Sequence, residues 1–232
     1  LSMKVMDAQV VYEDKNIVAL NKPAGVNFDW ALETRPELIP AHRLDKDTSG
    51  IILFAKNQET AEYLKSLFQD HKIKKTYLTL VVGNLKNNSG VIDLAIGRSK
   101  KTPLKRVAIG EQRGKIREAV TEYKVIKQCD SPAGGFALIE AYPKTGRTHQ
   151  IRSHFAAIGH PIVCDKLYAG KKFICPAGLK RQFLHAFAIE FNLPPLAPLL
   201  VKEGKGEVGS RLRLEADLPN DLENVKVLLC HH

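Results

Sequence analysis

The stretch HRLDKDTSGIILFAK, from His42 to Lys56, joins a highly charged turn to an apolar run. Asp45 stands between Arg43 and Lys46, just ahead of a Thr-Ser-Gly sequence typical of a turn. The GIILFAK segment that follows has the length and composition of a buried strand. The stretch therefore predicts one of two arrangements: a solvated turn, or a carboxylate held at the rim of a sheet for chemistry.

Most of the remaining chain also has the pattern of strands. The segments that predict strands are NIVAL (16–20), KKTYLTLVVG (74–83), VIDLAIG (91–97), AVTEYKVIK (119–127), FALIEAYP (136–143), FLHAFAIEF (183–191) and RLRLEADLP (211–219). Residues 57–68 have helical periodicity with Asn57 as the cap. HQIRSHFAAIG (149–159) predicts a second helix ending at Gly159, with a core stripe of Ile151, Phe155 and Ile158.

Many strands with few helices predict an α+β fold. We expect one domain over residues 3–230, built on a single mixed, largely antiparallel sheet with flanking helices. No internal repeat is evident in the sequence.

The charge balance is strongly basic. Lys and Arg number 35 against 25 Asp and Glu, which gives a net charge of +10. Such an excess is typical of proteins that neutralise nucleic-acid phosphates, although a basic protein kept soluble by its charge is the alternative. Residues Arg98 to Arg117 concentrate the basic side chains with two glycines and little periodicity. They predict a loop that is either solvated or grips phosphates.

Cysteine usage and hydropathy indicate the compartment. The four cysteines show no C-x-x-C spacing, so we expect reduced thiols in a cytoplasmic protein and no metal site. No apolar stretch has membrane length, so no membrane partner is expected. A P-loop and a dinucleotide fingerprint are both missing from the sequence, so no cofactor is expected. The cysteines are Cys129, Cys164, Cys175 and Cys230.

Two segments carry side chains suited to chemistry. In HRLDKDTSG, an ionised Asp45 could act as a nucleophile if a cation held it, and Arg43 could supply that cation or face RNA. KTGRTHQIRSH places basic groups at the start of a predicted helix, which is a natural anion site. They are Lys144, Arg147, His149 and Arg152. Solvated surface turns are the alternative for both segments. Tyr77, on a strand, is more often a packing residue unless its face lines a cleft.

These motifs resemble the RluA-type RNA pseudouridine synthases. HRLDKDTSG, KKTYLTLVVG, TGRTHQIRSHFAAIGHPIVCDKLY and RQFLHAFAIEF follow one another as in that family, and the resemblance covers nearly the whole chain. It implies the pseudouridine synthase catalytic fold and an enzyme that isomerises uridine to pseudouridine in RNA. The N1–C1′ bond of uridine breaks, the base rotates and C5 bonds to C1′, which requires no redox cofactor or metal.

The resemblance also implies roles for residues. Asp45 is the essential aspartate, Arg152 pairs with it, and Tyr77 packs against the target base and helps to remove the C5 proton. Arg43 helps to hold RNA with the base flipped out. Other RNA-binding residues are expected at His42, Lys144, Arg147 and His149. Asp45 could form a covalent adduct or take a C2′ proton to give a glycal, and the sequence leaves both routes open.

The resemblance has limits. The segment from Val26 to Pro40 is shorter than its family counterpart, so substrate choice does not transfer. A tRNA or rRNA stem-loop is the expected partner, a monomer is the default state, and no S4-type RNA-binding domain is expected. An RNA-binding protein without turnover would be expected to lack Asp45, Tyr77 or Arg152. A nuclease would need clustered carboxylates, whereas Asp47 stands only two residues from Asp45.

Overall fold

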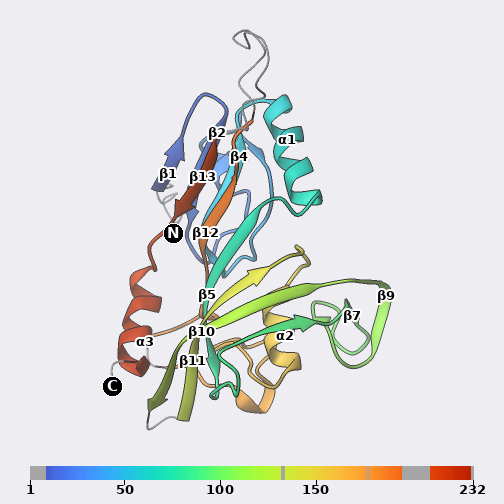
Figure 1. Ribbon diagram of the computed structural model, residues 1–232, viewed down its shortest axis with the longest axis vertical. Coiled ribbons are helices and arrows are strands. Elements are labelled where there is room, and N and C mark those ends of the chain that lie inside the picture. Colours follow the sequence, from blue (N-terminus) through green and yellow to red (C-terminus); the bar gives the residue numbers. More distant parts are fainter. Residues whose placement is uncertain (1–8, 132–133, 177, 195–209, 231–232) are drawn as a thin grey trace.

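A computed structural model of the chain describes residues 9–131, 134–176, 178–194 and 210–230. Its main feature is a ten-stranded sheet in which the central order is β1-β2-β4-β12-β5-β11-β10-β6 (Figure 1). In addition β13 pairs with β12, and β3 pairs with β4. The strands of this sheet are β1 (Gln9–Glu13), β2 (Ile17–Lys22), β3 (Ile39–Pro40), β4 (Ser49–Ala55), β5 (Lys74–Val82), β6 (Ser89–Asp93), β10 (Val120–Ser131), β11 (Gly134–Pro143), β12 (Leu184–Asn192) and β13 (Arg211–Glu215).

The pairing of these strands confirms the predicted α+β fold. Every pair in the sheet is antiparallel except β12 with β4, which is parallel. β12 comes late in the sequence and lies between β4 and β5, so it joins the two halves of the molecule (Figure 1). Every residue of β4 is buried, as the apolar run in the sequence predicts.

Three helices flank the sheet. α1 (Gln58–Gln69) begins as predicted, because the Asn57 side chain accepts a hydrogen bond from the Thr60 amide at 2.9 Å. α2 (Gln150–Ala157) buries Ile151 and Phe155. α3 (Asn220–Cys230) was not predicted from the sequence. Single 3-10 turns are η1 (Trp30–Glu33) and η2 (Gly170–Lys172). Within the described ranges, no helix has both the length and the apolar character needed to cross a bilayer.

The prediction that Ile158 belongs to the core stripe of α2 is wrong. Ile158 lies just after the last helical residue and is 37% exposed. The helix is shorter than predicted, so the turn that follows it carries Ile158 away from the core. Gly159 does end the segment in the left-handed region, with φ of 84°.

Residues 96–117 form a second, smaller sheet instead of the predicted loop. Its strands are β7 (Ile96–Ser99), β8 (Arg106–Val107) and β9 (Gln112–Arg117), in the order β8-β7-β9. The predicted strand 91–97 is correspondingly divided between β6 and β7. β9 was not predicted because its residues are almost all exposed and neither face of the strand is consistently apolar. A strand is recognised in a sequence by alternating apolar and polar residues, and β9 has no such alternation. We call residues 96–117 the basic arm.

The expectation of reduced thiols was also wrong. Cys129 on β10 is bonded to Cys230 at the end of α3, and Cys164 is bonded to Cys175. The first pair is separated by 101 residues, so only the packing of α3 on β10 brings it together. Cys164 is buried. The inference of a cytoplasmic location rested partly on free thiols, and that part no longer stands.

Candidate active site

Asp45 lies on a turn, residues 42–48, whose neighbours are anchored in the core. Leu44 is buried against Trp30 and Phe54, and the amide of Thr48 donates to the Asp45 carbonyl oxygen at 3.1 Å. We call residues 42–48 the Asp45 turn. Its anchoring on one side by Leu44 and on the other by β4 leaves the Asp45 side chain at the rim of the sheet.

The Thr-Ser-Gly sequence after the turn has a packing reason. Ser49 Oγ is hydrogen-bonded to His185 Nδ1 on β12 at 2.9 Å. Gly50 has φ of 116°, and a Cβ there would overlap the backbone of Ala186. Only glycine permits this approach of β4 to β12. The sequence therefore docks the Asp45 turn directly on the central strand.

Lys22 supports the turn from beneath. Its side chain is fully buried, and Nζ donates to the carbonyl oxygens of Pro23, Val26 and Lys46, each at 2.9 Å. Burial lowers the pKa of Lys22 to about 8, although the charges of Asp47 and Asp45 oppose that shift. The carbonyl of Lys46 also accepts from the Gly25 amide at 3.0 Å. The NKPAG segment thus holds the Asp45 turn in place.

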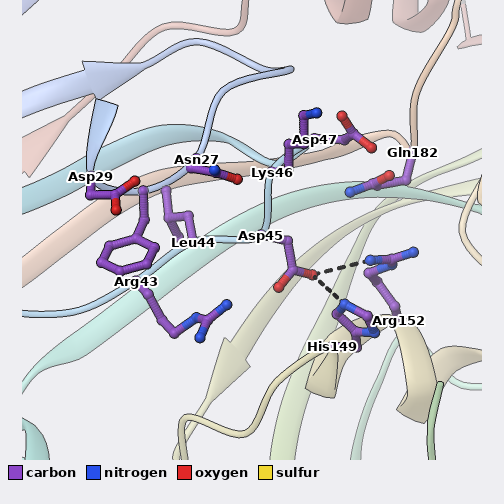
Figure 2. Close-up of a pocket in the computed structure, with 11 residues that line it drawn as sticks. Asn27, Asp29, Arg43, Leu44, Asp45, Lys46, Asp47, His149, Arg152 and Gln182 are labelled. Atoms are coloured by element: carbon purple, nitrogen blue, oxygen red, sulfur yellow. Dashed lines mark hydrogen bonds and ion pairs between the residues drawn. The ribbon is translucent and has the colours of Figure 1, made fainter. Parts of the chain in front are cut away.

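Arg152 on α2 faces Asp45, as Figure 2 shows. Its Nη1 donates to Asp45 Oδ2 at 3.2 Å. Its Nε and Nη2 donate to the two oxygens of Asp165, at 2.7 and 3.0 Å, and Asp165 is fully buried. Burial opposes the charge of Arg152, but hydrogen bonds and charge from Asp165, with a further contribution from Asp45, raise its pKa above the usual range. Asp165 therefore fixes the guanidinium plane and leaves one edge for Asp45.

His149 also faces Asp45 (Figure 2), with Nε2 3.8 Å from Asp45 Oδ2. Its backbone is left-handed, with φ of 56°. Its Nδ1 lies 3.0 Å from the hydroxyl of Tyr168, which donates to the Arg106 carbonyl at 2.8 Å and accepts from the Arg106 amide at 2.9 Å. Because the phenol has a single proton, this network assigns the Nδ1 proton to His149 as a donor. Burial lowers the pKa of His149, so its neutral form turns a lone pair toward Asp45.

Tyr77 lies on β5, on a face that lines a cavity also lined by Asp45. It packs between two of the apolar clusters, one on each half of the sheet. Burial and the charge of Asp45 both raise the pKa of its phenol, which is therefore protonated at neutral pH. The condition set for Tyr77 by the sequence is met, because the phenol borders a cavity as well as the core.

Two adjoining cavities open on Asp45. One of about 430 Å³, drawn in Figure 2, lies between the Asp45 turn and residues 27–29 of the short segment after NKPAG. The other, of about 490 Å³, contains Tyr77 and extends to the end of α1. Both are lined by Arg43, Leu44, Asp45, His149 and Arg152. The three predicted catalytic side chains therefore meet at one place.

The residues predicted to bind RNA are placed differently from one another. Arg43 is exposed at the cavity mouth, 5.3 Å from the Phe28 ring. Arg147 lines the cavity with Tyr77, and its Nε donates to the Glu118 carbonyl at 3.0 Å. Lys144 is exposed and forms an ion pair with Glu122 at 2.8 Å, and it does not line either cavity.

His42 has a clear structural contact. Its Nε2 accepts a hydrogen bond from the Leu53 amide at 3.0 Å, and its ring packs on Phe68 at 4.7 Å. Burial, with a smaller contribution from the charge of Lys75, lowers its pKa to about 3. His42 is therefore neutral at physiological pH, and the nitrogen that accepts from Leu53 is already occupied.

Sequence reasoning missed several residues of the site. Asp165 and Tyr168 both lie within the quoted CDKLY segment, but neither received a role. Neither Lys22 nor Lys75 was singled out. The available signal was the recurrence of charged residues inside otherwise apolar motifs, since a charge beside a buried segment needs a partner.

Comparisons with known proteins point to one family. A sequence model of the family described as RNA pseudouridylate synthase matches residues 16–157. The chain is 35% identical to ribosomal large subunit pseudouridine synthase C of Vibrio vulnificus, over 88% of this chain and 68% of that protein. It is 35% identical to tRNA pseudouridine synthase C of Vibrio parahaemolyticus, over 83% of this chain and 87% of that protein.

A solved structure is similar over nearly the whole chain. Human RNA pseudouridylate synthase domain containing 1 superimposes with a TM-score of 0.72 at 26% identity. The match covers 98% of this chain and 97% of the human one.

Proposed function

Because the chain belongs to the RNA pseudouridylate synthase family, we propose that it isomerises one specific uridine to pseudouridine in a structured ribosomal or transfer RNA. The observation that carries the proposal is the hydrogen bond of 3.2 Å between Arg152 Nη1 and Asp45 Oδ2, beside Tyr77 in an open cavity. A cytoplasmic location and a monomeric state remain predictions.

The target uridine must leave its helix to reach Asp45. Unstacking costs a few kcal/mol, which contacts in the cavity offset. Arg43, exposed and without a carboxylate partner among the described residues, lies at the mouth, where it can occupy the space left by the flipped base. The cavity of about 490 Å³ is large enough for a nucleoside.

Asp45 has one oxygen free for chemistry. Within the described part of the chain, Oδ2 faces Arg152 and His149, whereas Oδ1 accepts no hydrogen bond. Oδ1 either attacks the substrate to form an adduct or takes the C2′ proton to form a glycal. In the adduct route the Asp45–C1′ bond that forms as N1–C1′ breaks is itself broken when C5 bonds to C1′. In the glycal route N1–C1′ also breaks, and Asp45 returns the proton to C2′ when C5 bonds to C1′. In both routes the proton lost from C5 is matched by one gained at N1.

Tyr77 acts on the base in this scheme. Its neutral phenol packs against the flipped ring and assists loss of the C5 proton, passing its own proton to solvent water as it receives the one from C5. The raised pKa of Tyr77 supports a hydroxyl and not a phenolate in this role. Arg152 keeps a positive charge beside Asp45 throughout.

The test begins with pseudouridine mapping of RNA from cells with and without the gene, which identifies the target. Purified Asp45→Asn protein is then assayed for tritium release from the target labelled at uridine C5. We expect a loss on the order of 1000-fold or more with RNA binding retained, since the variant keeps the shape of the side chain and removes its charge.

The matched control is Asp47→Asn, which removes the same charge two residues away on the same turn. It should retain most activity. Substantial tritium release by Asp45→Asn would overturn the proposed chemistry.

A further inference from the structure

Lys75 lies close to Tyr77 on β5 and has no assigned role. The two residues are two apart on β5, so their side chains share a face at a spacing of about 6.7 Å. Both line the cavity of about 490 Å³ that contains Asp45. Lys75 therefore belongs to the same space as the target nucleoside, at the end nearer α1.

The charge around Lys75 is unbalanced. Among the described residues, no carboxylate oxygen lies within ion-pair distance of its Nζ or of the Arg147 guanidinium. Arg147 lies close enough to lower the pKa of Lys75 further, after burial as the main cause, to about 8. Two half-buried cations held together without an anion raise the free energy of the free protein.

Both side chains keep hydrogen-bond donors free. Lys75 Nζ donates to the Thr145 carbonyl at 3.1 Å, which uses one of its three protons. Arg147 donates through Nε to the Glu118 carbonyl, and its two terminal nitrogens have no acceptor among the described residues. The arrangement offers several convergent donors and two positive charges to one bound group, which is the chemistry that recognises a phosphate.

We infer that Lys75 and Arg147 bind a phosphodiester within one nucleotide of the flipped uridine. This inference rests on the proposed function, since it places RNA in the cavity. The bound phosphate supplies the missing negative charge and fixes the ribose relative to Asp45, so Lys75 is a substrate-binding residue.

The first experiment measures binding of uridine, uridine 3′-monophosphate and uridine 5′-monophosphate to the purified full chain by equilibrium dialysis. One of the two monophosphates should bind about tenfold tighter than uridine, as a charge-assisted hydrogen bond allows. Lys75→Gln should remove this preference, and Lys75→Arg should keep most of it.

Lys74→Gln is the matched control. Lys74 is the adjacent residue on the opposite face of β5, 73% exposed and paired with Glu190. Its replacement should leave the preference for the monophosphate unchanged. Equal binding of uridine and both monophosphates by the wild type, or an unchanged preference in Lys75→Gln, would overturn the inference.

A second measurement needs no variant. Trinitrobenzenesulfonate labels neutral amines, and mass spectrometry reports the labelling of Lys75 and Lys74 separately in the wild type. At about ten times its Kd, the monophosphate should slow Lys75 labelling about tenfold, because about one site in ten stays empty. Uridine at the same concentration should protect less, and equal protection by both would contradict a phosphate contact.

The two proposals can fail separately. Asp45→Asn should keep the preference for the monophosphate, since Asp45 does not contact Lys75. An active Asp45→Asn protein that still prefers the monophosphate would overturn the proposed chemistry alone. If Asp45→Asn is inactive, and neither it nor the wild type prefers the monophosphate over uridine, only the phosphate site is overturned.

Discussion

The Asp45 turn and the basic arm are held in opposite ways. The turn is anchored by buried Leu44, by Lys22 with three carbonyl contacts, and by β4, which is buried throughout. The basic arm is a three-stranded sheet whose strand β9 is almost entirely exposed. Two hydrogen bonds connect the arm to the site, and both join the backbone of Arg106 in the arm to the Tyr168 hydroxyl.

The difference follows from what each region has to do. A carboxylate that acts on one carbon atom must be held to within a fraction of an ångström, so its support is buried. Phosphate neutralisation tolerates movement, because it depends on charge near a long polyanion. We therefore expect changes near the turn to alter turnover and changes in the arm to alter affinity.

Among the changes that compare the two regions, the largest effect should come from Asp165→Asn. The amide can no longer hold both nitrogens of Arg152 by charge, so the guanidinium loses its fixed edge toward Asp45. We expect kcat to fall about 100-fold with the Kd for RNA nearly unchanged. Single-turnover tritium release and filter binding measure the two quantities, with thermal unfolding to verify that the chain is folded. A raised Kd for RNA at a normal kcat would contradict the role of Asp165 in holding Arg152 toward Asp45.

A smaller effect should come from the arm. Arg113, Lys115 and Arg117 all lie on β9, and all three are exposed. Replacing all three with Gln should weaken RNA binding about tenfold at 0.15 M salt and lower the salt slope by about 2 to 3. Turnover at saturating RNA should be unchanged.

The control for the arm replaces three exposed lysines elsewhere, Lys65, Lys124 and Lys127, with Gln. The net charge changes equally, so only the position of the charges differs. If both triple variants had the same salt slope, the arm would be a solvated surface without a special part in binding.

The smallest effect concerns pH. Lys75, with a pKa of about 8 in the free protein, is a cation below that pH and neutral above it. Anion binding favours the cation, so affinity for the uridine monophosphate should be constant below about pH 8 and fall as the pH rises further. Neighbouring His42 and Tyr77 do not titrate there, since their pKa values are lowered and raised respectively. Dialysis between pH 7 and 9 measures this dependence, and Lys75→Gln should abolish it.

Local patterns were sufficient for much of the fold. The Asn57 cap, the buried β4 and the strand β5 each depend on neighbours in sequence, and each was predicted. The pairing of Asp45 with Arg152 spans 107 residues and was expected only from the family resemblance. Asp165 was missed because its partner is chosen by packing and not by spacing. The same holds for Cys129 with Cys230, and for the basic arm, where pairing between strands overrides weak local patterns.

The position of β12 also fixes when the site can form during synthesis. Asp45 and Tyr77 belong to the first third of the chain, yet their strands β4 and β5 are joined only through residues 184–192. A nascent chain that has not yet exposed β12 has two unpaired strand edges and two separate halves of the cavity. Such long-range pairing is slow, and it leaves unpaired strand edges that can aggregate. A ribosome-bound chain that lacks β12 is therefore the species most in need of a chaperone.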